Sequence, residues 1–333
     1  MGKPVSRRRF LKDSGIALGA ATVCDLTELS HTVARQGGRP PVFFTRDISS
    51  QGLMRIHARL ARERALPGRV AVKLHSGEPG GHHFAGPELI KDLVQSIDGT
   101  IVECNTAYPG GRSETDAHKQ VLEDHGFTAI APVDVMDEEG FISLPFADGR
   151  NITEDFVGSH FANYDSFLIL SHFKGHAMGG FGGAIKNMAI GIASGEGKMW
   201  IHTAGVTRDR NEFGLAFRTE QNQFLESMAE AAGAVMHSLE NQVTYISLMN
   251  NLSIDCDCNG HPAPPELDDI GILASLDPVA LDKACVDLVY AADPQKSASL
   301  RQRMEARNGI HTLEHAEALG LGSLRYELVG IDT

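Results

Sequence analysis

Short apolar runs that lead into glycine-rich loops and then into amphipathic helices recur along the chain, and this alternation constrains its fold most. Residues 70–74 and 100–104 are short apolar runs typical of strands. Helical periodicity begins at Pro87 and returns over 113–125, where Ser113 is the predicted N-cap. Strands that alternate with helices in this way indicate a parallel sheet rather than a chain of hairpins.

A further run, Phe167–Leu170, is apolar throughout and predicts a strand that is buried on both faces. We therefore predict an α/β fold with a mostly parallel sheet flanked by helices. In such sheets ligands gather at the carboxyl ends of the strands. Residues 38–333 are predicted to form a single α/β domain, and a division into two lobes with the site between them stays open.

The first 37 residues are predicted to be an export signal with its linker. Residues 6–12 read Ser-Arg-Arg-Arg-Phe-Leu-Lys, and a weakly apolar stretch follows over 16–23. This pattern resembles a twin-arginine signal, and the alternative is a basic helix N-terminus. The resemblance implies the twin-arginine translocase as a partner and a periplasmic or extracytoplasmic location. That pathway carries folded proteins, often with a cofactor already bound.

The charge balance and the cysteine count exclude several classes of protein. Thirty Lys and Arg face 43 Asp and Glu, so the formal net charge is −13. A surface of this sign repels phosphate backbones, and we expect no nucleic-acid partner. No apolar run reaches the roughly 18 residues that a membrane span needs. Five scattered cysteines are too few for a disulfide framework.

The exit loop of the Phe167–Leu170 strand is the most unusual segment of the chain. Residues 171–187 combine five glycines with two histidines and two lysines. Glycines let a backbone approach a ligand closely, and the charged side chains supply donors, bases or a metal ligand. The alternative is a glycine-rich turn with solvated histidines. The candidate cofactor-binding and catalytic residues are His172, Lys174, His176, Gly179, Gly180, Gly182, Gly183 and Lys186.

A second cluster of titratable residues follows the predicted strand at 70–74. Lys73 and His75 are two positions apart at its end, so both side chains are expected on one face. We consider them candidate catalytic residues that face the ligand. A solvated loop is an equally weighted alternative.

A third candidate site is the Cys-x-Cys pair formed by Cys256 and Cys258. In an extended segment the two thiols share a face and can meet one soft metal ion. A closed zinc site needs four ligands, and nearby His261 is a further candidate. The alternative is two ordinary cysteines in a loop.

Asp277 and Pro278 form a typical helix start. An aspartate at the N-cap accepts a backbone N–H, and proline suits the first helical position. We therefore interpret this segment, with Asp282 in the following helix, as a capped helix.

These segments together resemble the domain of unknown function 362 (DUF362) family. The resemblance is carried by residues 70–79, 171–192, 255–260 and 269–282 and spans about residues 40–330. Many family members insert a ferredoxin module after the position of His202. No Cys-x-x-Cys-x-x-Cys motif occurs in this chain, so no iron–sulfur cluster is expected.

A more distant resemblance, to nickel-pincer lactate racemases, implies a mechanism. Their histidine, lysine and histidine spacing is matched by His176, Lys186 and His202, although Ile185 replaces the arginine that precedes the lysine. The resemblance implies that Lys186 carries the pincer pyridinium and that His202 binds nickel. His176 would take the hydroxyl proton of the substrate while hydride moves to the cofactor.

Three functions follow from these patterns. The first is an exported enzyme that uses a nickel-pincer nucleotide or another metal ion on a small hydroxy acid or carbonyl compound. Its reaction would be that of an isomerase, a racemase or an oxidoreductase. The second is a metal-binding or redox-accessory protein that uses Cys256 and Cys258 without catalysis. The third is a small-ligand binding protein whose glycine-rich loop holds an anion.

Overall fold

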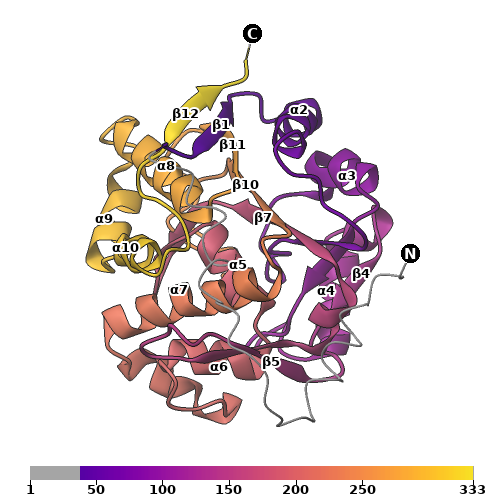
Figure 1. The fold of residues 1–333 in the computed structure, drawn as a ribbon, viewed down its shortest axis with the longest axis vertical. Helices are drawn as coiled ribbons and strands as arrows, with labels where there is room; N and C mark the ends of the chain where they lie inside the picture. The colour runs from indigo at the N-terminus through magenta and orange to yellow at the C-terminus, as the bar shows by residue number, and fades with distance from the viewer. Residues whose placement is uncertain (1–37, 333) are drawn as a thin grey trace, which may run out of the picture. The chain divides into compact units, whose positions relative to one another are not determined.

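A single eight-stranded sheet organises the part of the chain that the computed structural model describes, residues 38–332 (Figure 1). Its strand order is β12-β1-β11-β10-β7-β2-β3-β4, and all neighbours pair in parallel except the two pairs made by β11. The strands are β1 (Pro41–Thr45), β2 (Val70–Lys73), β3 (Thr100–Glu103), β4 (Val133–Val135), β7 (Ser166–His172), β10 (Val243–Met249), β11 (Gly271–Ser275) and β12 (Glu327–Gly330). The predicted α/β class with a mostly parallel sheet is confirmed.

Helices cover both faces of this sheet (Figure 1). On one face lie α2 (Ser50–Ala61) and α3 (Pro87–Ser96), and on the other lie α5 (Ala184–Ile192), α7 (Gln221–Ser238) and α8 (Pro278–Ala291). The remaining α-helices are α4 (Thr115–Asp124), α6 (Gly195–His202), α9 (Ala298–Ala306) and α10 (His311–Ala318). From Pro40 onward these elements pack as one compact unit. Among the described residues, no helix has the length and apolarity needed to cross a bilayer.

The side chains of β7 show why its sequence is apolar without alternation. Leu168 and Leu170 belong to the core under α2 and α3, whereas Phe167 and Ile169 belong to the core under α5, α7 and α8. Successive side chains of a strand point to opposite faces, and here both faces are covered. The strand therefore buries every residue.

Local detail departs from the sequence prediction in two places. Ser113 is not a helix cap: α4 begins at Thr115 after Glu114, and the Ser113 hydroxyl donates to the carbonyl of Gly110. Two hairpins were not predicted, because their strands are only three to five residues long. They are β5 (Phe141–Pro145) with β6 (Glu154–Gly158), and β8 (Lys174–His176) with β9 (Gly180–Gly182). The predicted export signal lies outside the described residues.

Candidate functional site

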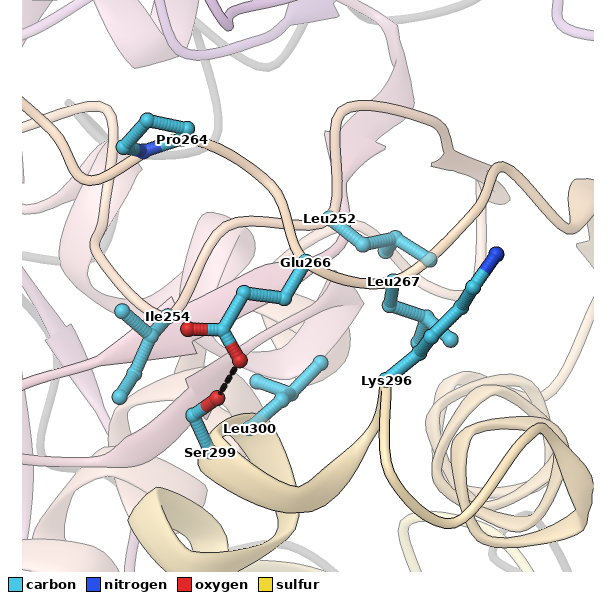
Figure 2. A pocket seen from close by; sticks show the side chains of 8 residues that line it. All are labelled: Leu252, Ile254, Pro264, Glu266, Leu267, Lys296, Ser299 and Leu300. Atoms are coloured by element: carbon cyan, nitrogen blue, oxygen red, sulfur yellow. Dashed lines mark hydrogen bonds between the residues drawn. The ribbon is translucent and has the colours of Figure 1, made fainter.

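Two hollows are candidates for a ligand site, and the smaller one holds none of the predicted site residues. Figure 2 shows mostly apolar side chains around it, with Ser299 donating to the Glu266 carboxylate. It encloses about 200 Å³ of empty space, against about 590 Å³ for the larger hollow. The larger hollow is therefore the candidate site, and we call it the central pocket.

The central pocket lies where the carboxyl ends of neighbouring strands meet. Its walls come from the segments that follow β2 and β3, from β8, and from α5, α6 and the loop after β10. Its polar lining residues are Lys73, His75, Glu103, Thr106, Tyr108, Arg112, His176, Lys186, Asn187, Lys198, His202 and Cys258. Six predicted site residues from separate segments thus share one pocket: Lys73, His75, His176, Lys186, His202 and Cys258.

Lys73 is held in a buried ion pair on the pocket wall. Its ammonium lies 2.7 Å from Glu103, and Glu103 also lies 3.5 Å from the guanidinium of Arg112. Burial lowers the pKa of Lys73, and the charge of Glu103 opposes that shift. Burial also opposes ionisation of Glu103, yet Lys73 and Arg112 lower the pKa of this carboxyl to about 2. Lys73 therefore lines the pocket as an ammonium group whose charge is compensated by the Glu103 carboxylate.

His75 and His176 present the same arrangement on the pocket wall. The Nδ1 atom of His75 accepts the backbone N–H of Gly77 at 3.1 Å, and that of His176 accepts the N–H of Gly179 at 2.8 Å. Burial lowers the pKa of both rings, helped by Arg112 at His75 and by Lys186 at His176. A neutral ring whose Nδ1 accepts carries its proton on Nε2. The His176 imidazole is therefore set up as a neutral hydrogen-bond donor at Nε2. The Nε2 atom of His75 instead lies 3.4 Å from the Arg112 guanidinium, which can only donate, so both ring nitrogens of His75 face donors.

This tautomer affects whether His176 can act as the base, the role that its resemblance to the histidine of lactate racemases implies. To take a proton on Nε2, the ring would first have to carry its proton on Nδ1. That tautomer would face the N–H groups of Gly179 and Met178 with another donor. In the geometry described here, His176 donates to a ligand oxygen more readily than it removes a proton.

Lys186 and His202 have the free atoms that a bound cofactor would need. In the described part of the chain, the half-buried Lys186 makes no hydrogen bond or ion pair. His202 donates from Nδ1 to the carbonyl of Lys198 at 2.6 Å, which leaves the Nε2 lone pair for a metal. Its ring stacks on Phe224 with centroids 4.9 Å apart, and burial lowers its pKa to about 4. The ring is thus fixed and neutral.

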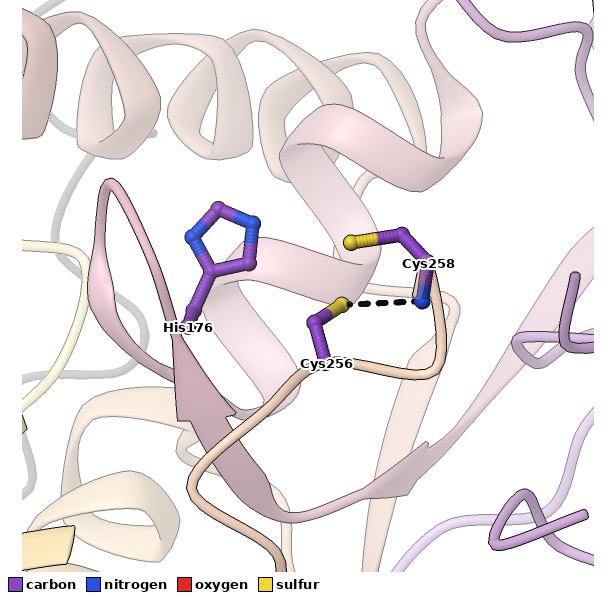
Figure 3. Close-up of side chains that lie close together, drawn as sticks. All are labelled: His176, Cys256 and Cys258. Atoms are coloured by element: carbon purple, nitrogen blue, oxygen red, sulfur yellow. Dashed lines mark hydrogen bonds between the residues drawn. The ribbon is translucent and has the colours of Figure 1, made fainter. Parts of the chain in front are cut away.

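The cysteine pair, predicted as a separate site, meets His176 at the edge of the central pocket. Figure 3 shows both sulfur atoms beside the imidazole, and one ligand atom from each residue lies within 4.8 Å of the others. The backbone N–H of Cys258 donates to Sγ of Cys256 at 3.4 Å. A hydrogen bond from Cys258, with the charges of Lys186 and Lys174, lowers the pKa of Cys256. Cys256 is thereby favoured as a thiolate.

The predicted cofactor residues His172 and Lys174 do not line the central pocket. Both bind Asp257, which lies between the two cysteines: His172 Nδ1 is 2.9 Å and Lys174 Nζ is 2.7 Å from its carboxylate. Burial opposes ionisation of Asp257, but these two partners hold its pKa below the usual range. They therefore anchor the cysteine loop to β7 and β8.

The four glycines predicted to bind a cofactor do not line the central pocket, and their close contacts are with other parts of the chain. Gly180 has a φ of +81° and abuts Gly309, and a Cβ on Gly183 would lie 2.3 Å from Asp282. The Asp282 carboxylate accepts the first N–H groups of α5, which leaves them closed to an anion. Gly179 donates to His176, and Gly182 lies beside the side chains of two lysines.

Sequence reasoning missed several pocket residues, four of which carry a charged or phenolic side chain. Glu103, Tyr108 and Arg112 lie at or after the end of β3, in a second glycine-rich loop whose position after a strand was the available signal. Lys198 comes from α6, where nothing in the sequence distinguishes it from a solvated lysine. His261, considered as a further ligand, does not join the cluster of His176 and the two cysteines.

Fold and site together define an α/β protein with a histidine-, lysine- and cysteine-lined pocket at the carboxyl ends of its sheet. The chain belongs to the domain of unknown function (DUF362) family, whose model matches residues 70–287. No curated protein matches it.

Two solved structures are similar to the chain at low identity. One is the lactate racemase apoprotein from Thermoanaerobacterium thermosaccharolyticum, with 12% identity, a TM-score of 0.45, and coverage of 74% of this chain and 56% of that one. The other is a protein from Thermotoga maritima, with 13% identity, a TM-score of 0.38, and coverage of 71% and 57%. The chain spans less than two thirds of either neighbour, so neither activity is carried over to it.

Proposed function

We propose that the protein is an exported enzyme that transfers hydride and a proton on a small hydroxy acid or carbonyl compound, with a nickel-pincer-like cofactor at Lys186 and His202. The observation that carries the proposal is that His176, Lys186 and His202, chosen because their spacing resembles that of nickel-pincer lactate racemases, line one pocket although they come from three elements. The twin-arginine pattern at residues 6–12 supports export.

The residues present fit such a cofactor. The free amine of Lys186 suits a covalent link, and the Nε2 lone pair of His202 suits a metal ion. When bound, the cofactor supplies an acceptor for the hydrogen on the substrate carbon. A soft thiolate ligand is also close by at Cys256, with the Cys258 thiol beside it.

The chain's own groups supply the polar chemistry around the substrate. His176 holds a proton on Nε2 and can donate it in a hydrogen bond to a hydroxyl or carbonyl oxygen, and the Arg112 guanidinium beside His75 lines the same pocket as a further donor. Donors fixed in advance stabilise charge that develops on such an oxygen. The aromatic ring of Phe213 lines the pocket and packs against Tyr108, which adds an apolar wall beside the polar groups.

The test is the metal and mass analysis of the protein purified from its native host. We expect close to one nickel per chain and an added mass on the peptide that contains Lys186. The Lys186→Ala variant should lose both, whereas Lys91→Ala, which removes an exposed lysine on α3, should retain them. Full nickel content in Lys186→Ala would refute the proposal.

A second candidate function is a metal-binding protein that uses the cysteine pair. The observation in its favour is the closeness of His176, Cys256 and Cys258. Three ligands leave a zinc site one short, and His176 offers a proton rather than a lone pair at Nε2. Replacement of both cysteines by serine should abolish metal binding if this function is correct and leave Lys186-dependent nickel unchanged if it is not.

A further inference from the structure

We propose that Lys198 binds an oxyanion, the carboxylate or phosphate group of the ligand that enters the central pocket. The inference rests on the proposed function only in that it takes this pocket as the ligand site. It requires neither nickel nor turnover, and it assigns a role to a residue outside every sequence motif.

Lys198 is buried and its ammonium is held in place. Only 7% of the residue is exposed, and Nζ donates to the carbonyl of Ala193 at 2.5 Å and to that of Cys104 at 3.4 Å. An ammonium has three donors, so one remains after these two bonds. Because Lys198 lines the central pocket, that donor is available to a ligand there.

The charge of Lys198 has no carboxylate partner. Within residues 38–332, no carboxylate oxygen lies within 4.0 Å of its Nζ atom. Asp137 acts on Lys198 only from beyond ion-pair distance, and its oxygens make their direct hydrogen bonds with the backbone N–H groups of Asn105 and Gly195. Asp155 is also in range, but burial raises its pKa to about 8, so it is neutral at pH 7. A buried cation without a partner is costly, and a bound anion would compensate it.

The other cations of the pocket are not equivalent to Lys198. Lys73 is paired with Glu103, and Arg112 lies 2.9 Å from Glu78. Lys186 has no ion-pair partner among the described residues, but in the proposed function its amine is linked covalently to the cofactor. Lys198 is therefore the fixed positive charge that remains for a substrate or for an anionic group of a cofactor.

This charge distribution also favours an anion over a neutral ligand. The whole chain carries a net charge of −13, yet the pocket contains two unpaired ammonium groups. A cleft of one sign with walls of low dielectric constant concentrates ligands of the opposite sign. Small hydroxy acids meet this requirement through their carboxylate.

The experiment measures binding to the purified full chain by isothermal titration calorimetry. The probes are L-lactate, its neutral analogue lactamide, and inorganic phosphate. The variants are Lys198→Met, which removes the charge, and Lys198→Arg, which keeps it. Lys91→Met is the matched control, since it removes an exposed lysine on α3. Thermal unfolding of each variant separates a loss of binding from a loss of folding.

We expect L-lactate or phosphate to bind the unaltered protein at least tenfold more tightly than lactamide. Lys198→Met should weaken anion binding by about tenfold to a hundredfold, as the loss of one charge-assisted hydrogen bond predicts. Lys198→Arg should retain most of the affinity, and Lys91→Met all of it. A response confined to lactate assigns a carboxylate, and one confined to phosphate assigns a phosphate group.

Three results would overturn the proposal. They are binding of lactamide as tight as that of both anions, no binding of either anion, and an unchanged anion affinity in a folded Lys198→Met protein. Nickel content in Lys186→Ala reports separately on the cofactor, so failure of one proposal is distinguishable from failure of the other.

Discussion

Replacing Asp257 with asparagine should remove the carboxylate that is ion-paired with the buried Lys174 ammonium, and it should destabilise the loop that carries the two cysteines. The Lys174–Asp257 distance is 2.7 Å, and the two side chains are 6% and 3% exposed. The same carboxylate also accepts from His172 at 2.9 Å. An asparagine retains one acceptor oxygen for these two donors and carries no charge.

The structure gives the magnitude of this effect. Removing one partner of a buried pair leaves an uncompensated charge and costs about 3–5 kcal/mol. Both side chains are almost fully buried, so solvent screening does not reduce this figure. We therefore expect the Asp257→Asn protein to lose about 3–5 kcal/mol in its free energy of unfolding.

The assay is equilibrium unfolding in urea, with Asp268→Asn as the matched control. Asp268 forms a Lys–Asp pair of nearly the same length, 2.6 Å to Lys296, but its side chain is 77% exposed. The control should therefore change stability far less, because solvent screens exposed pairs. An unchanged dependence on urea concentration would show that both proteins still unfold in one step.

A pH series adds an independent check. The pKa of Asp257 is lowered in the folded state, so its contribution is present above its ordinary pKa of 3.8 and is lost as pH falls through the lower, folded-state pKa. The stability gap to Asp257→Asn should narrow on acidification. A loss below about 1 kcal/mol at neutral pH, the range of exposed pairs, or an equal loss in Asp268→Asn, would refute the reasoning.

Three further predictions follow from the site. His176→Gln keeps a hydrogen-bond donor near the position of Nε2, so in steady-state kinetics it should retain part of the activity that His176→Ala loses. An equal loss of activity in both variants would instead indicate that His176 acts as a base. Gly175→Ala should destabilise the fold in urea, since its Cβ would lie 2.0 Å from the carbonyl of Ile254. Burial raises the pKa of Asp282 from 3.8 to about 7. The stability of the unaltered protein, compared with that of Asp282→Asn in thermal unfolding, should therefore fall as pH rises between these two values. A stability difference that stays constant over this pH range would contradict the prediction.

Local sequence signals predicted much of the fold because they reflect short-range physics. The apolar run at Phe167–Leu170 predicted a strand covered on both faces, and β7 is one. Asp277 with Pro278 predicted the start of α8, and the Asp277 carboxylate accepts the N–H of Ala280 as expected. The Ser113 cap failed because a turn with Gly110 competes for the same hydroxyl.

The candidate site was only partly predictable, because its residues are brought together by strand order. Spacing selected His176, Lys186 and His202, which lie within 26 residues of one another. Nothing local indicated that Cys256 would approach His176, or that Lys198 would be buried without a carboxylate.

The sequence by itself therefore determined the alternation of strands and helices and the types of chemical group that follow the strands. Tertiary structure alone decided which of those groups share a pocket and which charged groups are compensated by an ion-pair partner. The physical reason is that periodicity and capping act over a few residues, whereas the charge of Lys73 is compensated by Glu103, which is 30 positions away. Likewise, Asp282 of α8 accepts the first N–H groups of α5 from nearly a hundred residues along the chain, because these two helices pack together on one face of the sheet.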